Sequence, residues 1–283
     1  MTARLLDISA AEYFADPGER PTLTQSIAHT LVTKTPAHAY LEHPRLGGGR
    51  DKATAALKSG SLIDALILGG WERKVGIVEF DDFKKKDAQA ERDALAAAGK
   101  LAVTRPQFHE AQDTAGILTD KLASRGFRFT GKSQAVILWT EESTSGPVEC
   151  RAMLDHVFIE EGVIWDLKTI HEASTERCAA HTYDYGHDIQ RAAYSRALDR
   201  LMESKRFGGP DFVFLFCEIH PPYCITPSRL DGQFRMIGER RWETAVETWG
   251  RCLRANEWPE YAAKNEVVRL EPRPWVVARE LGA

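Results

Sequence analysis

The chain has 283 residues, of which 43% are hydrophobic and 28% are charged, a composition typical of a soluble protein with one large core or two modest ones. With 41 acidic and 37 basic residues, bulk charge gives no support to nucleic-acid binding, although a locally basic channel is compatible with it. No apolar run approaches membrane-spanning length, and acidic residues occur too early for a secretory signal, so we expect a cytoplasmic protein that does not associate with membranes.

The N-terminal part, residues 1–130, is predicted to be mainly helical. A capping box, "SAAE", opens a short helix at Ser9. Further helices are predicted at 24–33, from Pro36 to about 43, at 52–68, at 86–99 and at 105–126. The run "KVGIVEF" predicts one strand at 74–80. The glycine-rich loop at 45–50 lacks the spacing of a phosphate-binding loop.

Strand signals dominate from residue 131 onward. Three β-rich runs, separated by the turn-like "STSG" and "EEG", predict an antiparallel meander at 133–142, 148–160 and 162–170. A long helical region, two more strands and a closing helix are predicted at about 172–206, 211–219, 223–228 and 231–256. This order predicts a mixed α/β core, residues 131–283, joined to the helical N-terminal region in a single domain, 1–283.

The five cysteines are widely spaced and include no CxxC pair: Cys150, Cys178, Cys217, Cys224 and Cys252. Zinc sites and iron–sulfur clusters usually need close pairs, so these are interpreted as packing thiols of a reduced protein.

The run "VIWDLKTI" places two opposite charges in an apolar strand. Asp166 and Lys168 share one face of the strand, and Leu167 points the other way, into the core. Taken alone, the pair would be a salt bridge. Asp155, however, lies one short hairpin away, and antiparallel pairing across "EEG" would bring it opposite residues 166–168. Two carboxylates could therefore converge.

Neighbouring carboxylates raise each other's pKa unless a cation lies between them. Oxygen ligands of this kind suit Mg²⁺ or Mn²⁺, and the carbonyl of Leu167 could add a further ligand. Lys168 beside such a site could orient an attacking water, help its deprotonation or neutralise charge on a phosphoryl group. The pattern predicts a metal site for phosphodiester hydrolysis.

Two further sets of side chains could contact the substrate. Gln190 and Tyr194 are four residues apart on one helix face and could reach over the site; otherwise they are a surface amide and a partly buried ring. Basic residues that could track phosphates, or could simply form a solvated face, are Arg191, Arg196, Arg200, Lys121, Arg125, Arg128 and Lys132.

Together, Asp155, "WDLKT" (165–169) and "DIQRAAY" (188–194) resemble the PD-(D/E)xK nuclease superfamily. More closely, they resemble its RecE-type (exonuclease VIII C-terminal domain) and lambda-exonuclease-like phage exonucleases. Softer similarities in "LTQSIAHTLVTKTPAHAYLEH" and "CLRANEWPEY" extend the resemblance over most of the chain. It implies a restriction-endonuclease-like core, with a mixed central sheet flanked by helices.

The resemblance also implies roles for individual residues. Catalytic roles fall to Lys168, Asp155, Asp166, Gln190 and Tyr194, and metal ligation to Asp155, Asp166, the Leu167 carbonyl and Asp64. DNA contacts fall to Ser26, Gln134, Thr169 and Arg191. The sequence departs from the family pattern at Asp64, where a histidine is common, and at Gln134, where a glutamate is common. Gln134 leaves open whether one metal binds or two.

The activity implied is a Mg²⁺- or Mn²⁺-dependent exonuclease that digests linear double-stranded DNA 5′→3′ in phage-type recombination. The resemblance further implies a homo-oligomeric ring, a single-strand annealing partner of the RecT/Beta type, and a phage or prophage origin in a bacterial cell. Two alternatives remain: an endonuclease or repair nuclease on the same core, and a catalytically weakened member that only binds DNA. Iron–sulfur members of the Cas4 type are disfavoured by the cysteine spacing.

Overall fold

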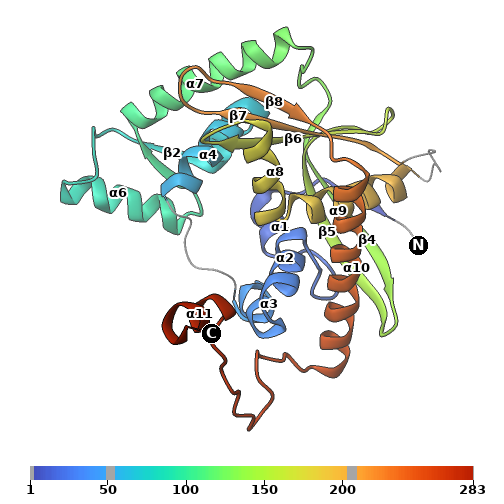
Figure 1. The fold of residues 1–283 in the computed structure, drawn as a ribbon. Coiled ribbons are helices and arrows are strands. Elements are labelled where there is room, and N and C mark those ends of the chain that lie inside the picture. Colours follow the sequence, from blue (N-terminus) through green and yellow to red (C-terminus); the bar gives the residue numbers. More distant parts are fainter. Residues whose placement is uncertain (1–2, 49–54, 203–208, 283) are drawn as a thin grey trace.

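A six-stranded sheet with helices on both faces forms the centre of the computed structural model, which describes residues 3–48, 55–202 and 209–282 (Figure 1). In the described residues, the strand order of this sheet is β1–β4–β5–β6–β7–β8, and within it β6 and β7 are the parallel pair. The strands are β1 (Arg4–Leu6), β4 (Lys132–Ser143), β5 (Gly146–Phe158), β6 (Val163–Ile170), β7 (Asp211–Glu218) and β8 (Ile225–Ser228). The predicted class, a mixed sheet flanked by helices, is confirmed.

The predicted meander is present as β4, β5 and β6, each antiparallel to the next. Gly146, with φ +108°, closes the first hairpin, and Gly162, with φ +66°, lies in the second. Both backbones are in the left-handed region that glycine adopts without steric cost. The two turn signals therefore set the register that brings β5 beside β6.

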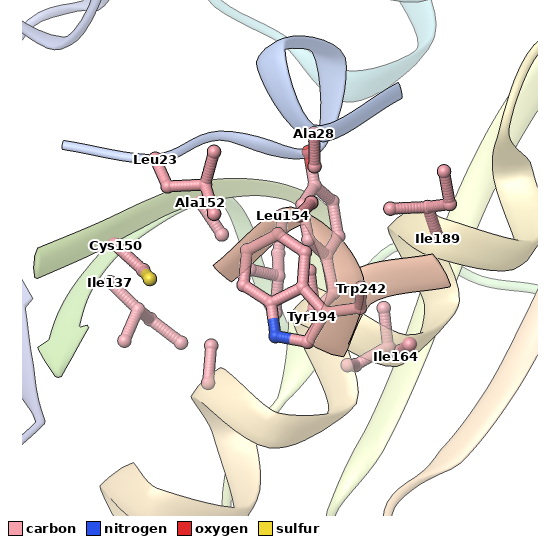
Figure 2. Close-up of a cluster of buried hydrophobic side chains, with 14 of the residues drawn as sticks. Leu23, Ala28, Ile137, Cys150, Ala152, Leu154, Ile164, Ile189, Tyr194 and Trp242 are labelled. Atoms are coloured by element: carbon pink, nitrogen blue, oxygen red, sulfur yellow. The ribbon is translucent and has the colours of Figure 1, made fainter. Parts of the chain in front are cut away.

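One face of the sheet is covered by α2 (Gln25–Thr33), α9 (His187–Met202) and α10 (Gly232–Ala255). Their apolar side chains pack with those of β4 and β5 in a core that includes Leu154, Trp242 and Tyr194 (Figure 2). The opposite face is covered by α4 (Ala55–Leu68) and α7 (Arg105–Ser124), which pack on Leu167 and its neighbours. Leu167 thus anchors β6 to the second core, as expected from strand alternation.

The capping box predicted at Ser9 is confirmed, since Ser9 and Glu12 form it at the start of α1 (Ala10–Phe14). Thr24 caps α2, which was predicted at 24–33. Pro36 opens α3 (Pro36–Glu42), and Thr104 caps α7. The predicted first residues of α4, 52–54, and the end of the glycine-rich loop lie outside the described residues.

Two predicted elements needed correction. The strand at 74–80 is shorter, β2 (Val75–Val78), and does not join the central sheet; it pairs in parallel with β3 (Leu101–Thr104) across α6 (Lys86–Ala97). The helical region predicted at about 172–206 consists of two helices, α8 (Thr175–Asp184) and α9, because Gly186 at φ +70° ends helical geometry between them; its last part, 203–206, lies outside the described residues.

Four elements were not predicted: β1, β3, α5 (Trp71–Lys74) and α11 (Pro274–Leu281). The first three span only three or four residues each, which is too short for a periodic pattern. α11 lies at the C-terminal end of the chain, away from the sheet (Figure 1). Over the described part of the chain, no helix combines the length and apolar character needed to cross a membrane.

Candidate functional site

The candidate site lies where β5 and β6 separate. Their backbone pairing runs from Phe158↔Val163 to His156↔Trp165 and goes no further. The next position in that register would place Asp155 opposite Asp166. Here the Asp155 side chain takes the place of a backbone carbonyl as hydrogen-bond acceptor, because its Oδ2 accepts a hydrogen bond of 3.0 Å from the Leu167 N–H. The opening between the strands thus brings one carboxylate next to the other strand's "DLK" run.

Asp166 is fully buried and is held by two neighbours. Lys168 Nζ forms an ion pair with its Oδ1, as expected for two residues on one strand face. Gln190 Nε2, on α9, donates a hydrogen bond of 2.6 Å to its Oδ2. Gln190 is itself buried, so it is not the surface amide of the alternative interpretation. The helix motif and the strand motif therefore meet at this carboxylate.

Tyr194 lies deeper than expected. Its ring is buried in the core between α9 and the sheet (Figure 2). Burial raises the pKa of its hydroxyl well above the ordinary value, and the charges of Tyr13 and Asp166 raise it further. A hydrogen bond to Gln190 acts in the opposite direction. Tyr194 thus supports Gln190 from the core side.

The electrostatics of the site are those of crowded carboxylates. Burial raises the pKa of Asp166 to about 7; Lys168 opposes this shift and Asp155 reinforces it. Burial also raises the pKa of Asp155, against the positive charges of Lys168 and Lys74. For Lys168, burial alone would lower the pKa, but the two carboxylates raise it above its ordinary value. Lys168 is therefore the main group that favours the ionised form of both carboxylates.

Asp64 joins this group from α4, on the other face of the sheet. Burial raises its pKa well above the ordinary value, and the charges of Asp155 and Asp166 add to the shift. Its Oδ1 is shut off from solvent and has no hydrogen-bond partner among the described residues. Asp64 was predicted as a metal-site residue, and the fold brings it within electrostatic range of the other two carboxylates.

Lys74, at the end of α5, was missed by the sequence reasoning. Burial lowers its pKa, while Asp155 and Asp64 act to raise it. A lone lysine in a run of charged residues carries no sequence signal. Only the folded chain shows that it faces the carboxylates.

The donor atoms suit a hard divalent cation. Three carboxylates, of Asp64, Asp155 and Asp166, are buried or partly buried close to one another, and Lys168 and Lys74 only partly offset their negative charge. Asp64 Oδ1 has no hydrogen-bond partner among the described residues. The side chains are nevertheless not drawn together: within the described ranges, no three Asp, Glu, His or Cys groups are at metal-binding spacing. The oxygen ligands of these residues are therefore of the type that binds such an ion, although Lys168 forms an ion pair with Asp166 Oδ1.

Two other predicted residues border the site. Gln134 lies at the register position across from Asp155, and its φ of +53° interrupts the regular β4–β5 pairing there. Thr169 lies against α4, since a Cβ on Gly60 would collide with the Thr169 hydroxyl. Gly60 therefore allows the close approach that brings α4 and Asp64 to β6.

A cavity of about 530 Å³ opens beside Asp155. Ser26 and Gln25 of α2, Arg151 of β5 and Tyr194 also line it, together with the aromatic rings of Tyr13 and Phe14. Ser26 was predicted to contact DNA, and it lies in the same cavity as Asp155. The cavity gives a ligand access to one carboxylate of the site.

The basic residues proposed to track phosphates are largely engaged within the protein. Arg191 is buried and pairs with Glu239 at 3.0 Å, so it could reach a phosphate only by breaking that pair. Arg196 and Arg200 bind glutamates of β4 and α10. Lys121 and Arg125 donate to backbone carbonyls at 222, 223 and 225, next to or within β8. These residues bind helices and loops together.

Comparison with known proteins agrees with this geometry. A family model described as "PDDEXK-like domain of unknown function (DUF3799)" matches residues 30–271. No curated protein sequence matches the chain significantly. A crystal structure of a predicted exonuclease from Eubacterium rectale superposes with a TM-score of 0.59 at 13% identity, over 98% of this chain and 100% of that one.

A second crystal structure, of a phage-related exonuclease from Haemophilus somnus 129PT, gives a TM-score of only 0.32 at 10% identity. It covers 69% of this chain and 95% of the other. At 13% identity the first structure supports only the fold, and the TM-score of the second is too low to support any conclusion.

Proposed function

The chain belongs to the PDDEXK-like family, and we propose that it is a divalent-metal-dependent deoxyribonuclease that degrades linear double-stranded DNA from its ends. The observation that carries this proposal is the convergence of Asp155, the Asp166–Lys168 ion pair and Gln190 where β5 and β6 separate. A structural salt bridge would not need a second buried carboxylate beside it.

Each residue has a distinct task in this proposal. Asp155, Asp166, Asp64 and the carbonyl of Leu167 would hold Mg²⁺ or Mn²⁺, which supplies an activated water and neutralises phosphoryl charge when bound. Lys168 brings a fixed positive charge to the place where negative charge develops on the phosphodiester. The remaining predicted DNA contacts, Ser26 and Thr169, flank these groups.

The cavity beside Asp155 is the position proposed for the DNA end. It holds the hydroxyl of Ser26 and the amide of Gln25, which can bind phosphates, and the exposed ring of Phe14, on which a base can stack. Digestion in the 5′→3′ direction, a ring-shaped homo-oligomer, an annealing partner of the RecT/Beta type and a role in phage recombination extend the proposal. These extensions are supported only by the resemblance of the sequence motifs.

The test is a digestion assay on linear duplex DNA labelled at either end, with Mg²⁺, Mn²⁺ or EDTA. Metal-dependent release of mononucleotides from ends is the expected result, and the labelled end that is lost first gives the polarity. Cleavage of closed circular DNA would instead indicate an endonuclease. If neither metal supports any cleavage at high protein concentration, the proposal is wrong.

A further inference from the structure

One exposed aromatic side chain lies at the cavity beside Asp155. Phe14, the last residue of α1, is 62% exposed, and it lines the same cavity as Asp155 and Ser26. A single exposed apolar side chain is ordinary on a protein surface and needs no explanation by itself. Phe14 differs from the other exposed rings in how firmly its helix is held and in what lies beside it.

Helix α1 has only five residues, and both of its ends are fixed. At its start, Ser9 forms the capping box. Beyond its end, Asp16, with φ +71°, accepts a hydrogen bond of 2.8 Å from the Thr22 hydroxyl and pairs with Arg151 at 2.7 Å. Because an isolated helix of this length is unstable in water, these contacts determine where Phe14 lies.

Tyr13 connects the Asp16 cluster to Phe14. Its ring is buried, and the Arg151 guanidinium carbon lies 5.3 Å from the ring centroid, in a cation–π contact. The Phe14 ring packs edge to face with Tyr13, with centroids 5.2 Å apart and an interplanar angle of 73°. The contacts from Asp16 through Arg151 and Tyr13 therefore hold an exposed ring in a fixed position.

One face of β5 leads from these rings to the candidate site. Arg151, Met153 and Asp155 alternate along the strand with buried core residues, so their side chains share a face, and all three line the cavity. Four residues of strand span roughly 13 Å, which separates the backbone of Asp155 from that of Arg151. The cavity volume of about 530 Å³ is in the range of sites for single small molecules, which suits one nucleotide.

We propose that Phe14 is a stacking platform for the base of the terminal nucleotide, whose phosphodiester bond is cut at Asp155 and its neighbours. Every nucleobase has a flat π face, so this contact favours any base over an abasic sugar and does not read the sequence. The inference rests on the proposed function, in which this cavity receives the DNA end. It adds a requirement on the substrate, because the last nucleotide must carry its base.

The first test measures stacking without cleavage. A duplex that ends in one unpaired 2-aminopurine is titrated with the protein in EDTA, because the fluorescence of this base falls when it stacks on an aromatic ring. We expect strong quenching with wild type and with Phe14→Tyr, which keeps a ring. Phe14→Leu keeps an apolar side chain without a ring, so it should quench little and bind this DNA about 10-fold more weakly.

The second test compares cleavage of duplexes whose terminal nucleotide carries either adenine or an abasic tetrahydrofuran. Wild type should cleave the adenine end about 10-fold faster at limiting DNA, because a stacked base contributes at least that factor to binding. This preference should persist in Phe14→Tyr and disappear in Phe14→Leu. Trp275→Leu removes a ring of similar exposure, 57%, on α11, and this control should match wild type in both tests.

Equal quenching by wild type and Phe14→Leu would overturn the inference, as would wild type that cleaves adenine and abasic ends at the same rate. A lower mass of Phe14→Leu in light scattering, with unchanged quenching, would also overturn it, since the ring would then bind a second copy of the chain. If quenching depends on Phe14 but no metal supports cleavage, the proposed function fails and the stacking site stands. If DNA is cut without any effect of Phe14, only the proposed function stands.

Discussion

The protein buries carboxylates in two places and treats them in opposite ways. Asp16, near the N-terminus, accepts hydrogen bonds from the Thr22 N–H and hydroxyl at 3.1 and 2.8 Å. It also pairs with Arg151 at 2.7 Å and contacts His43 at 3.2 Å. Burial alone would raise its pKa, but these partners outweigh burial and lower it. Asp16 is a carboxylate whose charge is fully compensated.

The carboxylates between β5, β6 and α4 are compensated much less. Asp155 and Asp166 share Lys168 and one hydrogen bond each from Leu167 and Gln190, and their pKa values are raised. Asp64 leaves one oxygen without a hydrogen-bond partner in the described part of the chain. Folding keeps such charge together at a cost in stability, which is typical of functional sites. The lowered pKa of Asp16 is typical of a structural carboxylate, whereas the raised pKa values of Asp155 and Asp166 are typical of carboxylates whose charge a bound cation would compensate.

Lys168→Ala should have the largest effect on activity. Removing the ammonium takes away the charge that faces the reacting phosphate, so cleavage should fall about 10³-fold. The metal ligands remain, so calorimetric Mn²⁺ affinity should change little. Lys84→Ala, at a side chain that is 89% exposed, is the control and should leave cleavage intact. Normal digestion by Lys168→Ala would contradict the assignment.

Asp16→Asn should cause the largest loss of stability. It leaves the buried Arg151 guanidinium without its carboxylate, which typically costs about 3 kcal/mol. Urea unfolding followed by circular dichroism measures this loss. Asp93→Asn, on an exposed ion pair with Arg92, should change stability by less than about 0.5 kcal/mol. If Asp16→Asn and Asp93→Asn have the same free energy of unfolding, the ion pair of Asp16 with Arg151 does not stabilise the fold more than an exposed ion pair does.

The Asp16 contribution should disappear in acid. Its pKa is lower in the folded state than the unfolded value of about 3.9, so the unfolded chain takes up the proton first as pH falls. The stabilisation is therefore complete above about pH 4 and is lost as pH falls further, through the folded-state pKa. Unfolding of wild type and Asp16→Asn at pH 7, 5, 4 and 3 should show a difference that narrows below pH 4. A constant difference would exclude this linkage.

Asp155→Asn makes the same substitution in the other region, with the opposite expectation. The asparagine oxygen can still accept from the Leu167 N–H, and a buried charge with a raised pKa is removed. Stability in EDTA should therefore be unchanged or slightly higher. Mn²⁺ affinity should fall at least about 10-fold, because an oxygen ligand has lost its charge. Unchanged affinity in calorimetry would place the cation elsewhere.

Gln134→Glu should have the smallest effect, and it tests whether the departure at Gln134 limits the site. A carboxylate opposite Asp155 should raise Mn²⁺ affinity about threefold, equivalent to about 0.6 kcal/mol. Repulsion between facing carboxylates should lower stability in EDTA by about 0.5 kcal/mol. Tighter binding without added activity would indicate that one cation is sufficient.

Much of the site was predictable because its signals are local. Strand alternation put Asp166 and Lys168 on one face, and the short "EEG" turn placed Asp155 in register across the hairpin. Helical spacing put Gln190 and Tyr194 on the same side of α9. The capping box predicted at Ser9 likewise depends on groups only three residues apart. None of these inferences requires knowledge of distant neighbours.

What the sequence by itself determined is therefore the three strands of the meander, the capping box at Ser9 and the pairing of "DLK" with Asp155, since turns and side-chain periodicity act over a few residues. Only the tertiary structure showed that Arg191 forms an ion pair with Glu239 and that β2 pairs with β3 outside the central sheet. It also showed that Lys74 lies close enough to Asp155 to influence its charge. It also decided that Asp16 meets Arg151 from far along the chain. These contacts depend on how whole layers pack, and burial and charge compensation exist only after that packing is complete.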